Sequence, residues 1–193
     1  IVFGDWSSDV CSSDLPEAAP AGAPAAQARK YGVKSGIVHY EFGSKMATMT
    51  KVFYFDDFGA KECFEASYEG KLTETQFTDG KDRYLIRADN PKVAWNQGQA
   101  YYGIAKKITR KEFGGQRDVA ELPARSLCGK ECEVYAVKAG SQTITFAGWE
   151  GVQMLMESDG AMAAFERAVR AEFEVPVPAE KFQVPEGCEV KKP

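Results

Sequence analysis

The sequence predicts an α+β protein that is mostly β and is built on an antiparallel sheet. Three apolar runs, over residues 36–42, 46–55 and 61–69, predict this class, because apolar and polar side chains alternate in each with a period of two. The turn at residues 56–59 supplies the carboxylates and the glycine of a tight reversal. We therefore expect the chain to open as a β-meander with one buried face.

Length and composition indicate one globular domain with a sizeable core. The chain has 193 residues, of which 44% are hydrophobic and 27% are charged, and these are ordinary values for a globular protein. No apolar run approaches the roughly 18 residues that a membrane-spanning helix needs. The net charge of −4 provides no general attraction for nucleic acid, so we expect no nucleic-acid partner.

The first fifteen residues are excluded from fold reasoning as an artefactual segment. Residues 6–15 back-translate without a mismatch to a common short-read sequencing adapter. Without Asp5, Asp9 and Asp14, the 28 acidic residues become 25 against 24 Lys and Arg, and without Cys11 four cysteines remain. The Ala/Pro-rich residues 16–30 predict a flexible linker of the kind that often follows a signal peptide or a lipid-anchored cysteine. The domain then covers residues 31–193.

A hairpin and a helix are expected after the opening meander. Residues 72–77 and 83–88 flank a turn that contains Asp79-Gly80, which is a strong hairpin signal. Residues 93–95 suggest a short further strand. Residues 101–113 are the best helix candidate, because apolar side chains recur there at helical spacing and the pair Gly114-Gly115 follows. This helix could pack on the core or lie on an anionic membrane.

The second half of the chain resumes the strand pattern. Residues 116–127, which contain Pro123, are expected to form a connector. Residues 161–173 have helical propensity but also alternate, and we assign them to a strand. Residues 174–187 carry three prolines and are expected to be extended. The remaining expected strands cover residues 131–138, 143–147 and 151–157.

Several of these stretches together resemble the outer-membrane lipoprotein carrier (Lol-type) superfamily of bacterial envelope proteins. The resemblance rests on residues 36–41, the turn at 55–59 with Lys61-Glu62, residues 129–135, residues 149–152, and a closing run over 175–178 and 182–187. It implies a strongly curved antiparallel sheet, an incomplete barrel, wrapped over one or two helices. It also implies that the concave face can hold lipid acyl chains. The carriers use an arginine in the early sheet, and residues 36–69 contain none, which argues against lipoprotein transport itself.

The concave face of such a sheet is apolar and is filled either by the protein's own helix or by an apolar ligand. The sequence leaves both alternatives open. The candidates for lining a ligand cavity are Val38, Tyr40, Phe42, Val52, Tyr54, Phe64 and Tyr68.

The cysteines and the single histidine are the other candidate chemical sites. Four cysteines in an envelope protein most simply form disulfides, and those of this chain are Cys63, Cys128, Cys132 and Cys188. Three pairings are possible, and we favour Cys63–Cys188 with Cys128–Cys132. Free buried thiols are the alternative. The Cys-x-x-x-Cys spacing of residues 128–132, with His39 as a third ligand, would suit a thiol or copper-handling protein. No nucleophile elbow accompanies His39, so we expect no catalytic residue, no metal and no cofactor.

The sequence therefore predicts a non-enzymatic bacterial envelope protein that binds a lipid or another apolar ligand in a half-barrel cavity. The alternative is a structural or protein-interaction module of the same fold, with a self-filled core and an envelope protein partner. The Cys-x-x-x-Cys function is the third possibility. The expected location is periplasmic, outer-membrane-anchored or secreted.

Overall fold

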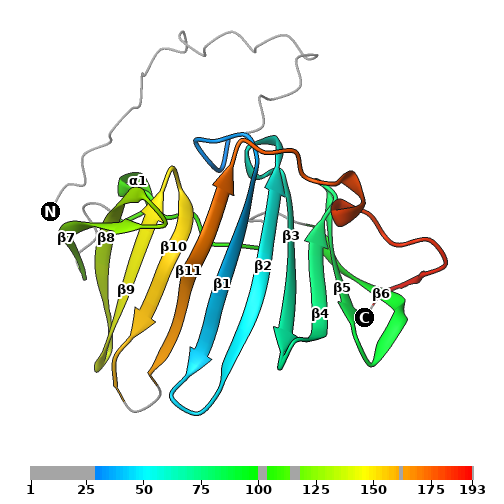
Figure 1. Ribbon diagram of the computed structural model, residues 1–193, viewed down its shortest axis with the longest axis horizontal. Helices are drawn as coiled ribbons and strands as arrows, with labels where there is room; N and C mark the ends of the chain where they lie inside the picture. The colour runs from blue at the N-terminus through cyan, green and yellow to red at the C-terminus, as the bar shows by residue number, and fades with distance from the viewer. Residues whose placement is uncertain (1–28, 100–103, 114–117, 161–162, 193) are drawn as a thin grey trace, which may run out of the picture.

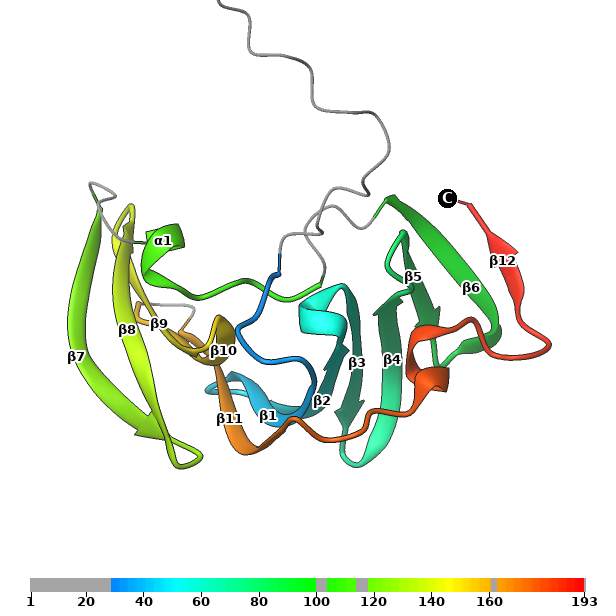
Figure 2. The same ribbon diagram turned by 90° about the horizontal axis from the view of Figure 1, so that it is seen from above.

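Twelve strands form one large, open and strongly curved sheet in the computed structural model (Figure 1). The structure describes residues 29–99, 104–113, 118–160 and 163–192. The sheet does not close into a barrel, and Figure 2 shows it from above as a trough. The strand order is β12-β6-β5-β4-β3-β2-β1-β11-β10-β9-β8-β7. The predicted fold class, mostly β with a curved antiparallel sheet, is thus confirmed.

Two meanders meet in the middle of this sheet. The first runs outward from the centre and consists of β1 (Gly36–Ser44), β2 (Thr48–Asp56), β3 (Lys61–Tyr68), β4 (Lys71–Thr78), β5 (Asp82–Arg87) and β6 (Asn90–Gln99). The second runs back from the far edge and consists of β7 (Val119–Leu127), β8 (Lys130–Ala139), β9 (Gln142–Trp149), β10 (Val152–Ser158) and β11 (Ala164–Phe173). The antiparallel pairing of β1 with β11 joins them. The strand β12 (Glu189–Lys191) pairs in parallel with β6.

Most of the strands predicted from alternation are confirmed. The structure contains strands in the three opening runs, in the hairpin around Asp79-Gly80, and in residues 164–173, where propensity alone favoured a helix. The predicted short strand at residues 93–95 is the middle of the ten-residue β6. The parallel strand β12 was missed, because three exposed residues carry no readable periodicity.

Two predictions in the middle of the chain are wrong. The helix expected over residues 101–113 is present only as α1 (Arg110–Phe113), and residues 104–109 cross the trough as an irregular segment; Tyr101–Gly103 lie outside the described residues. Residues 116–127 were expected to form a connector, but from Val119 onward they form the edge strand β7. Pro123 suggested a break, but an edge strand tolerates proline, and the pairing of β7 with β8 is irregular between Leu122 and Arg125.

The sheet is covered on both faces by segments of the same chain. On the outer face, residues after β11 pack Val177, Phe182 and Val184 against a buried cluster that includes Cys63 and Phe77. The short 3₁₀ helix η2 (Ala179–Phe182) carries Phe182, which is 4% exposed. This helix interrupts the extended conformation that we predicted for residues 174–187. No helix in the described part of the chain is long and apolar enough to cross a membrane.

The segment after β11 should stabilise the sheet through Phe182. Phe182→Ala removes a buried aromatic ring and leaves a cavity, so we expect the free energy of unfolding in urea to fall by about 3–5 kcal/mol. The control is Val190→Ala on β12, where the side chain is 50% exposed and the change should stay within about 0.5 kcal/mol. Equal effects of the two substitutions would show that the segment does not hold the outer face.

Candidate functional site

A single buried carboxylate, Glu62 on β3, organises the concave side of the sheet. Its side chain is 0% exposed and accepts bonds from two segments distant in sequence. Lys30 places its Nζ 2.6 Å from Oε1, and the Tyr31 hydroxyl donates to the same oxygen at 2.5 Å. The other oxygen, Oε2, accepts the backbone N–H groups of Ile104 and, at 3.3 Å, Ala105. One side chain therefore holds two crossing segments on the sheet.

We call residues 29–35 the N-terminal strap and residues 104–109 the cross strap. The cross strap exists because β6 is next to one edge strand of the sheet and β7 is the other edge strand, so the chain between them has to traverse the trough (Figure 2). The same view shows the N-terminal strap entering the trough beside it. Lys107 of the cross strap donates from Nζ to the carbonyl oxygen of Arg29 at 3.4 Å, so the two straps touch.

The N-terminal strap fills the centre of the trough with Tyr31. Its ring is 2% exposed, and its centroid lies 4.8 Å from that of Phe55 and 6.4 Å from that of Phe53. The backbone N–H of Gly32 donates to the Glu150 carbonyl at 2.8 Å, which fixes the strap on the opposite side as well. Tyr31 can occupy this position because residue 59 is a glycine. A Cβ on Gly59 would lie 2.7 Å from the Tyr31 ring, and the Gly59 φ of +87° also favours glycine.

The cross strap is fixed by Ile108. Its N–H donates to the carbonyl of Gly151 at 2.9 Å, and its side chain, 1% exposed, packs with Phe113 of α1 and with Tyr135 and Phe146 of the sheet. Gly148 is required beneath it, because a Cβ at that position would lie 2.4 Å from the Ile108 Cβ. These tertiary bonds to Glu62 and Gly151 replace the helix that the spacing of Ile104, Ala105 and Ile108 predicts.

Burial sets the protonation of the groups around Glu62. Desolvation raises the pKa of Tyr31 well above its usual value, and the Glu62 carboxylate adds to the rise. Tyr31 therefore remains a hydroxyl donor at all physiological pH values. Burial lowers the pKa of Lys30, while the charge of Glu62 opposes that effect. The cluster bonds the straps to the sheet and has the character of a structural anchor.

The strand register divides the seven predicted ligand-lining residues between the two faces. Val38 pairs with Phe53, and Phe53 pairs with Phe64, so their side chains share the concave face. Tyr40, Phe42 and Tyr68 belong to this face by alternation. Val52 and Tyr54 lie on the outer face, and their assignment to the concave face is wrong. Both faces of β2 are rich in apolar residues, so alternation alone could not choose between them.

Part of the concave face remains open beyond the straps. Val38 and Tyr40 are buried there, whereas Phe42, Met49 and Phe64 are half-buried and Tyr68 is 43% exposed. We call Phe42, Met49, Phe64 and Tyr68 the open row. Lys51 lies among them, with its Nζ 5.6 Å from the centroid of the Phe64 ring and 2.7 Å from the Glu166 carboxylate.

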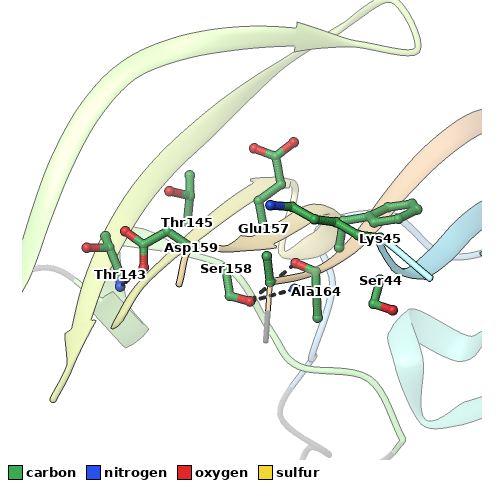
Figure 3. A pocket seen from close by; sticks show the side chains of 10 residues that line it. Ser44, Lys45, Thr143, Thr145, Glu157, Ser158, Asp159 and Ala164 are labelled. Atoms are coloured by element: carbon green, nitrogen blue, oxygen red, sulfur yellow. Dashed lines mark hydrogen bonds between the residues drawn. The ribbon is translucent and has the colours of Figure 1, made fainter. Parts of the chain in front are cut away.

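The described region has two cavities that are lined by residues other than the seven predicted to line a ligand cavity. One, of about 550 Å³, lies at the ends of β1, β9, β10 and β11, where Figure 3 shows Lys45, Glu157 and Asp159 among its walls. The other, of about 610 Å³, lies between the straps and the β9–β10 turn and includes Lys107, Lys111 and Trp149. Neither lining contains any of the seven residues that we predicted from sequence.

The four cysteines among the described residues, Cys63, Cys128, Cys132 and Cys188, are free thiols. Cys63 lies on β3, whereas Cys188 donates its Sγ hydrogen to the carbonyl of Pro91 on β6, three strands away. Three strand spacings amount to about 14 Å, so the expected Cys63–Cys188 disulfide is wrong for this fold. Cys128 and Cys132 sit at the β7–β8 hairpin and are not joined; their Sγ atoms bond to the carbonyls of Ala168 and Lys130.

The structure does not bring Cys128, Cys132 and His39 together as a copper site. His39 lies in β1 opposite Val52 and Arg170, on the outer face of the sheet. Among the described residues, no three His, Cys, Asp or Glu side chains are grouped so that they could hold a metal ion. The thiol or copper hypothesis therefore loses the geometry that it requires.

Comparison with solved structures shows that the fold occurs in other bacterial proteins. An uncharacterized conserved protein from Thermus thermophilus superposes with a TM-score of 0.58 at 7% identity, over 83% of this chain and 91% of that one. MucB superposes with a TM-score of 0.57 at 11% identity, over 84% of this chain and 61% of MucB. The Pseudomonas aeruginosa MucA/MucB complex gives 0.54 at 10% identity, over 81% and 58% of the respective chains. At these identities, the likeness shows the fold alone.

Sequence comparisons add no family assignment. No protein-family model matches the chain, and no curated protein has a matching sequence. Membership in the Lol-type superfamily therefore stays a prediction.

Removal of the Glu62 carboxylate should release both straps. Glu62→Ala leaves Lys30 without its buried counter-ion and two strap N–H groups without an acceptor, so we expect a loss of about 3–5 kcal/mol in the free energy of unfolding. Glu65→Ala is the matched control, because Glu65 is on the same strand and is also paired with a lysine, but it is 26% exposed. Its loss should be about 1 kcal/mol or less.

Hydrogen exchange would locate the effect. The amides of Ile104 and Ala105 should exchange faster in Glu62→Ala than in Glu65→Ala. Unchanged strap amides in Glu62→Ala would contradict the anchoring role.

Buried thiols should resist alkylation at neutral pH. Burial raises the pKa of Cys63 to about 12 and that of Cys132 to about 11, so little thiolate is present. We expect iodoacetamide to modify Cys188, the half-buried control, first, and to reach Cys63 and Cys132 only after unfolding. Because these folded pKa values lie above the unfolded value, their contribution to stability is complete below about pH 8.5 and is lost as the pH rises through the folded values. Modification of all three at one rate in native buffer would contradict this assignment.

Proposed function

We propose that the protein is a non-enzymatic interaction module of the bacterial envelope, with a self-filled core and a protein partner. The observation that carries this proposal is the occupied trough: Tyr31 and Ile108 from the two straps fill space that a lipid chain would otherwise take. The straps are bonded to Glu62 and to the β9–β10 turn, so displacing them would leave buried polar groups unpaired. A stable, preformed surface of this kind suits recognition of a macromolecule.

The similar fold of MucB supports this choice. MucB has been crystallised in complex with MucA, including a part of MucA designated MucA(peri). A protein that contains a curved sheet of this type therefore has a protein partner. The envelope location rests on the Lol-type resemblance and on this designation of the MucB partner.

The chemistry of the described site also supports a binding role. Tyr31, Lys30 and Glu62 are committed to bonds that hold the straps, and His39 lies on the opposite face from them. A catalytic acid or base would need to reach a substrate, and these buried groups face the protein's own chain. We accordingly propose that the protein performs no reaction.

A second candidate function is binding of a lipid or another apolar ligand, and the open row favours it. Phe42, Met49, Phe64 and Tyr68 expose apolar surface on the part of the concave face that the straps leave free. A ligand there would lie against the sheet beside the Lys51–Glu166 ion pair. This site is a shallow surface and does not require movement of the straps.

Native mass spectrometry after gentle extraction separates the two functions. For the interaction module, we expect the mass of the chain alone, and no saturable fluorescence change with the apolar probe N-phenyl-1-naphthylamine. A stoichiometric lipid adduct, or a saturable probe signal that Phe64→Ser abolishes, would establish the second function in place of the first.

A lysine-reactive cross-linker applied to an envelope preparation tests for the partner. Lys107 and Lys111 on the strap side should cross-link to one partner protein, whereas Lys61 and Lys181 should not. Cross-links spread evenly over all four lysines would contradict a defined interface.

A further inference from the structure

The two straps and α1 concentrate positive charge in a chain whose acidic and basic residues nearly balance. Residues 29–35 and 104–113 include one acidic residue, Glu112, whereas residues 16–193 carry 25 Asp and Glu against 24 Lys and Arg. Their basic residues are Arg29, Lys30, Lys34, Lys106, Lys107, Arg110 and Lys111. We call these seven residues the strap cations.

The fold brings five of the seven strap cations, all except Lys34 and Lys106, together around one cavity. Arg29, Lys107 and Lys111 line the space of about 610 Å³ between the straps and the β9–β10 turn. The bond from Lys107 Nζ to the Arg29 carbonyl joins the two segments at this point. Figure 2 shows α1 and the straps on the concave side of the sheet, where the trough opens. Like charges held this close raise the local positive potential.

Most of the strap cations form no ion pair with the described part of the chain. Lys30 is paired with Glu62, and Arg110 lies 3.3 Å from Glu121, where both side chains are at least half exposed. Arg29 lies 3.9 Å above the Phe58 ring, and Lys106 lies 4.5 Å from the centroid of Phe146, so both rest on aromatic faces. Arg29, Lys106 and Lys111 form no ion pair with any residue that the structure describes.

Carboxylates in the same lining restrict what can bind. Glu131, Glu133 and Glu150 also line the cavity. The Glu150 side chain lies against Gly32 of the N-terminal strap, and Glu133 accepts bonds from the Arg110 N–H and the Tyr135 hydroxyl. A phosphate array, as in nucleic acid or an anionic bilayer, would meet repulsion from these carboxylates. A peptide carries carboxylates for the lysines and N–H donors for the glutamates. Trp149, with Lys130 stacked 4.4 Å from its ring centroid, adds the aromatic surface common in protein interfaces.

We propose that the strap cations form the docking surface for an acidic segment of a partner protein. The inference rests on the proposed interaction function and deepens it by naming the chemistry of the partner. The acidic side chains contact Arg29, Lys107 and Lys111, and backbone N–H groups of the segment donate to the glutamates of the lining. Because the contacts are largely electrostatic, binding weakens as salt rises.

A fluorescein-labelled peptide of alternating Glu and Ala is the probe, and the corresponding Lys/Ala peptide is its charge-reversed counterpart. The test variant is Arg29→Glu with Lys111→Glu, which reverses two exposed strap cations. The control variant is Lys45→Glu with Lys71→Glu, which makes the same change in net charge at exposed sites on the opposite ends of the strands. All of these side chains are exposed, so both variants should keep the circular dichroism spectrum and unfolding midpoint of the parent.

We expect the Glu/Ala peptide to bind the parent and the control with similar Kd, and to bind the strap variant about tenfold more weakly. The Lys/Ala peptide should not bind. Equal weakening in both double variants would overturn the proposal, because net charge alone would then explain the binding. Tighter binding of phosphatidylglycerol vesicles or of a DNA oligonucleotide, lost in the strap variant, would also overturn it.

Competition separates this inference from the proposed function. Addition of the Glu/Ala peptide should abolish the cross-links of Lys107 and Lys111 to the partner. If those cross-links form but the peptide does not compete, the acidic-segment proposal fails and the interaction function stands. If no partner is cross-linked and a stoichiometric lipid is found, the interaction function itself fails.

Discussion

The buried carboxylate of Glu62 is the interaction on which the concave side of this protein depends. An open curved sheet creates a hollow, and a chain segment that crosses the hollow brings backbone N–H groups away from water. Those groups need acceptors, since an unpaired buried N–H costs about 1–3 kcal/mol. Glu62 supplies acceptors to both straps at once, and Lys30 balances its charge. The occupied trough and the position of the strap cations follow from this one side chain.

The topology explains why a segment has to cross the hollow at all. Two meanders are joined at β1 and β11, so the end of the first and the start of the second lie at opposite edges of the sheet. The chain between β6 and β7 therefore passes over the concave face, while the chain after β11 returns along the outer face to reach β6. Both faces gain a cover from these connections, and the sheet can remain open without a closing strand.

Alternation predicted much of the sheet because it reports a local property. Residues 36–42 present one apolar side, and their strand follows from that pattern. Residues 164–173 also alternate, although a bulge at Val169 puts Phe165 and Phe173 on opposite faces, and alternation identified their strand where alanine and glutamate favour a helix. Alternation could not assign a face where both faces of a strand are apolar. In β2 both faces are apolar, since Phe53 and Phe55 enter the concave core and Tyr54 enters the outer one, so Val52 and Tyr54 were assigned to the wrong face. Pro123 concealed β7 because its edge position could not be known from the sequence.

The sequence by itself determined the class of fold, most of the strands and the absence of a long apolar span, because these depend on periodicity and composition within short windows. Only the tertiary structure decided that residues 104–109 cross the trough without forming a helix, that Tyr31 fills its centre, and that Cys63 and Cys188 lie apart. The physical reason is that each of these outcomes depends on a partner far along the chain: the Glu62 carboxylate for the straps, Phe53 and Phe55 for Tyr31, and the strand order for the cysteines. No local pattern encodes such distances.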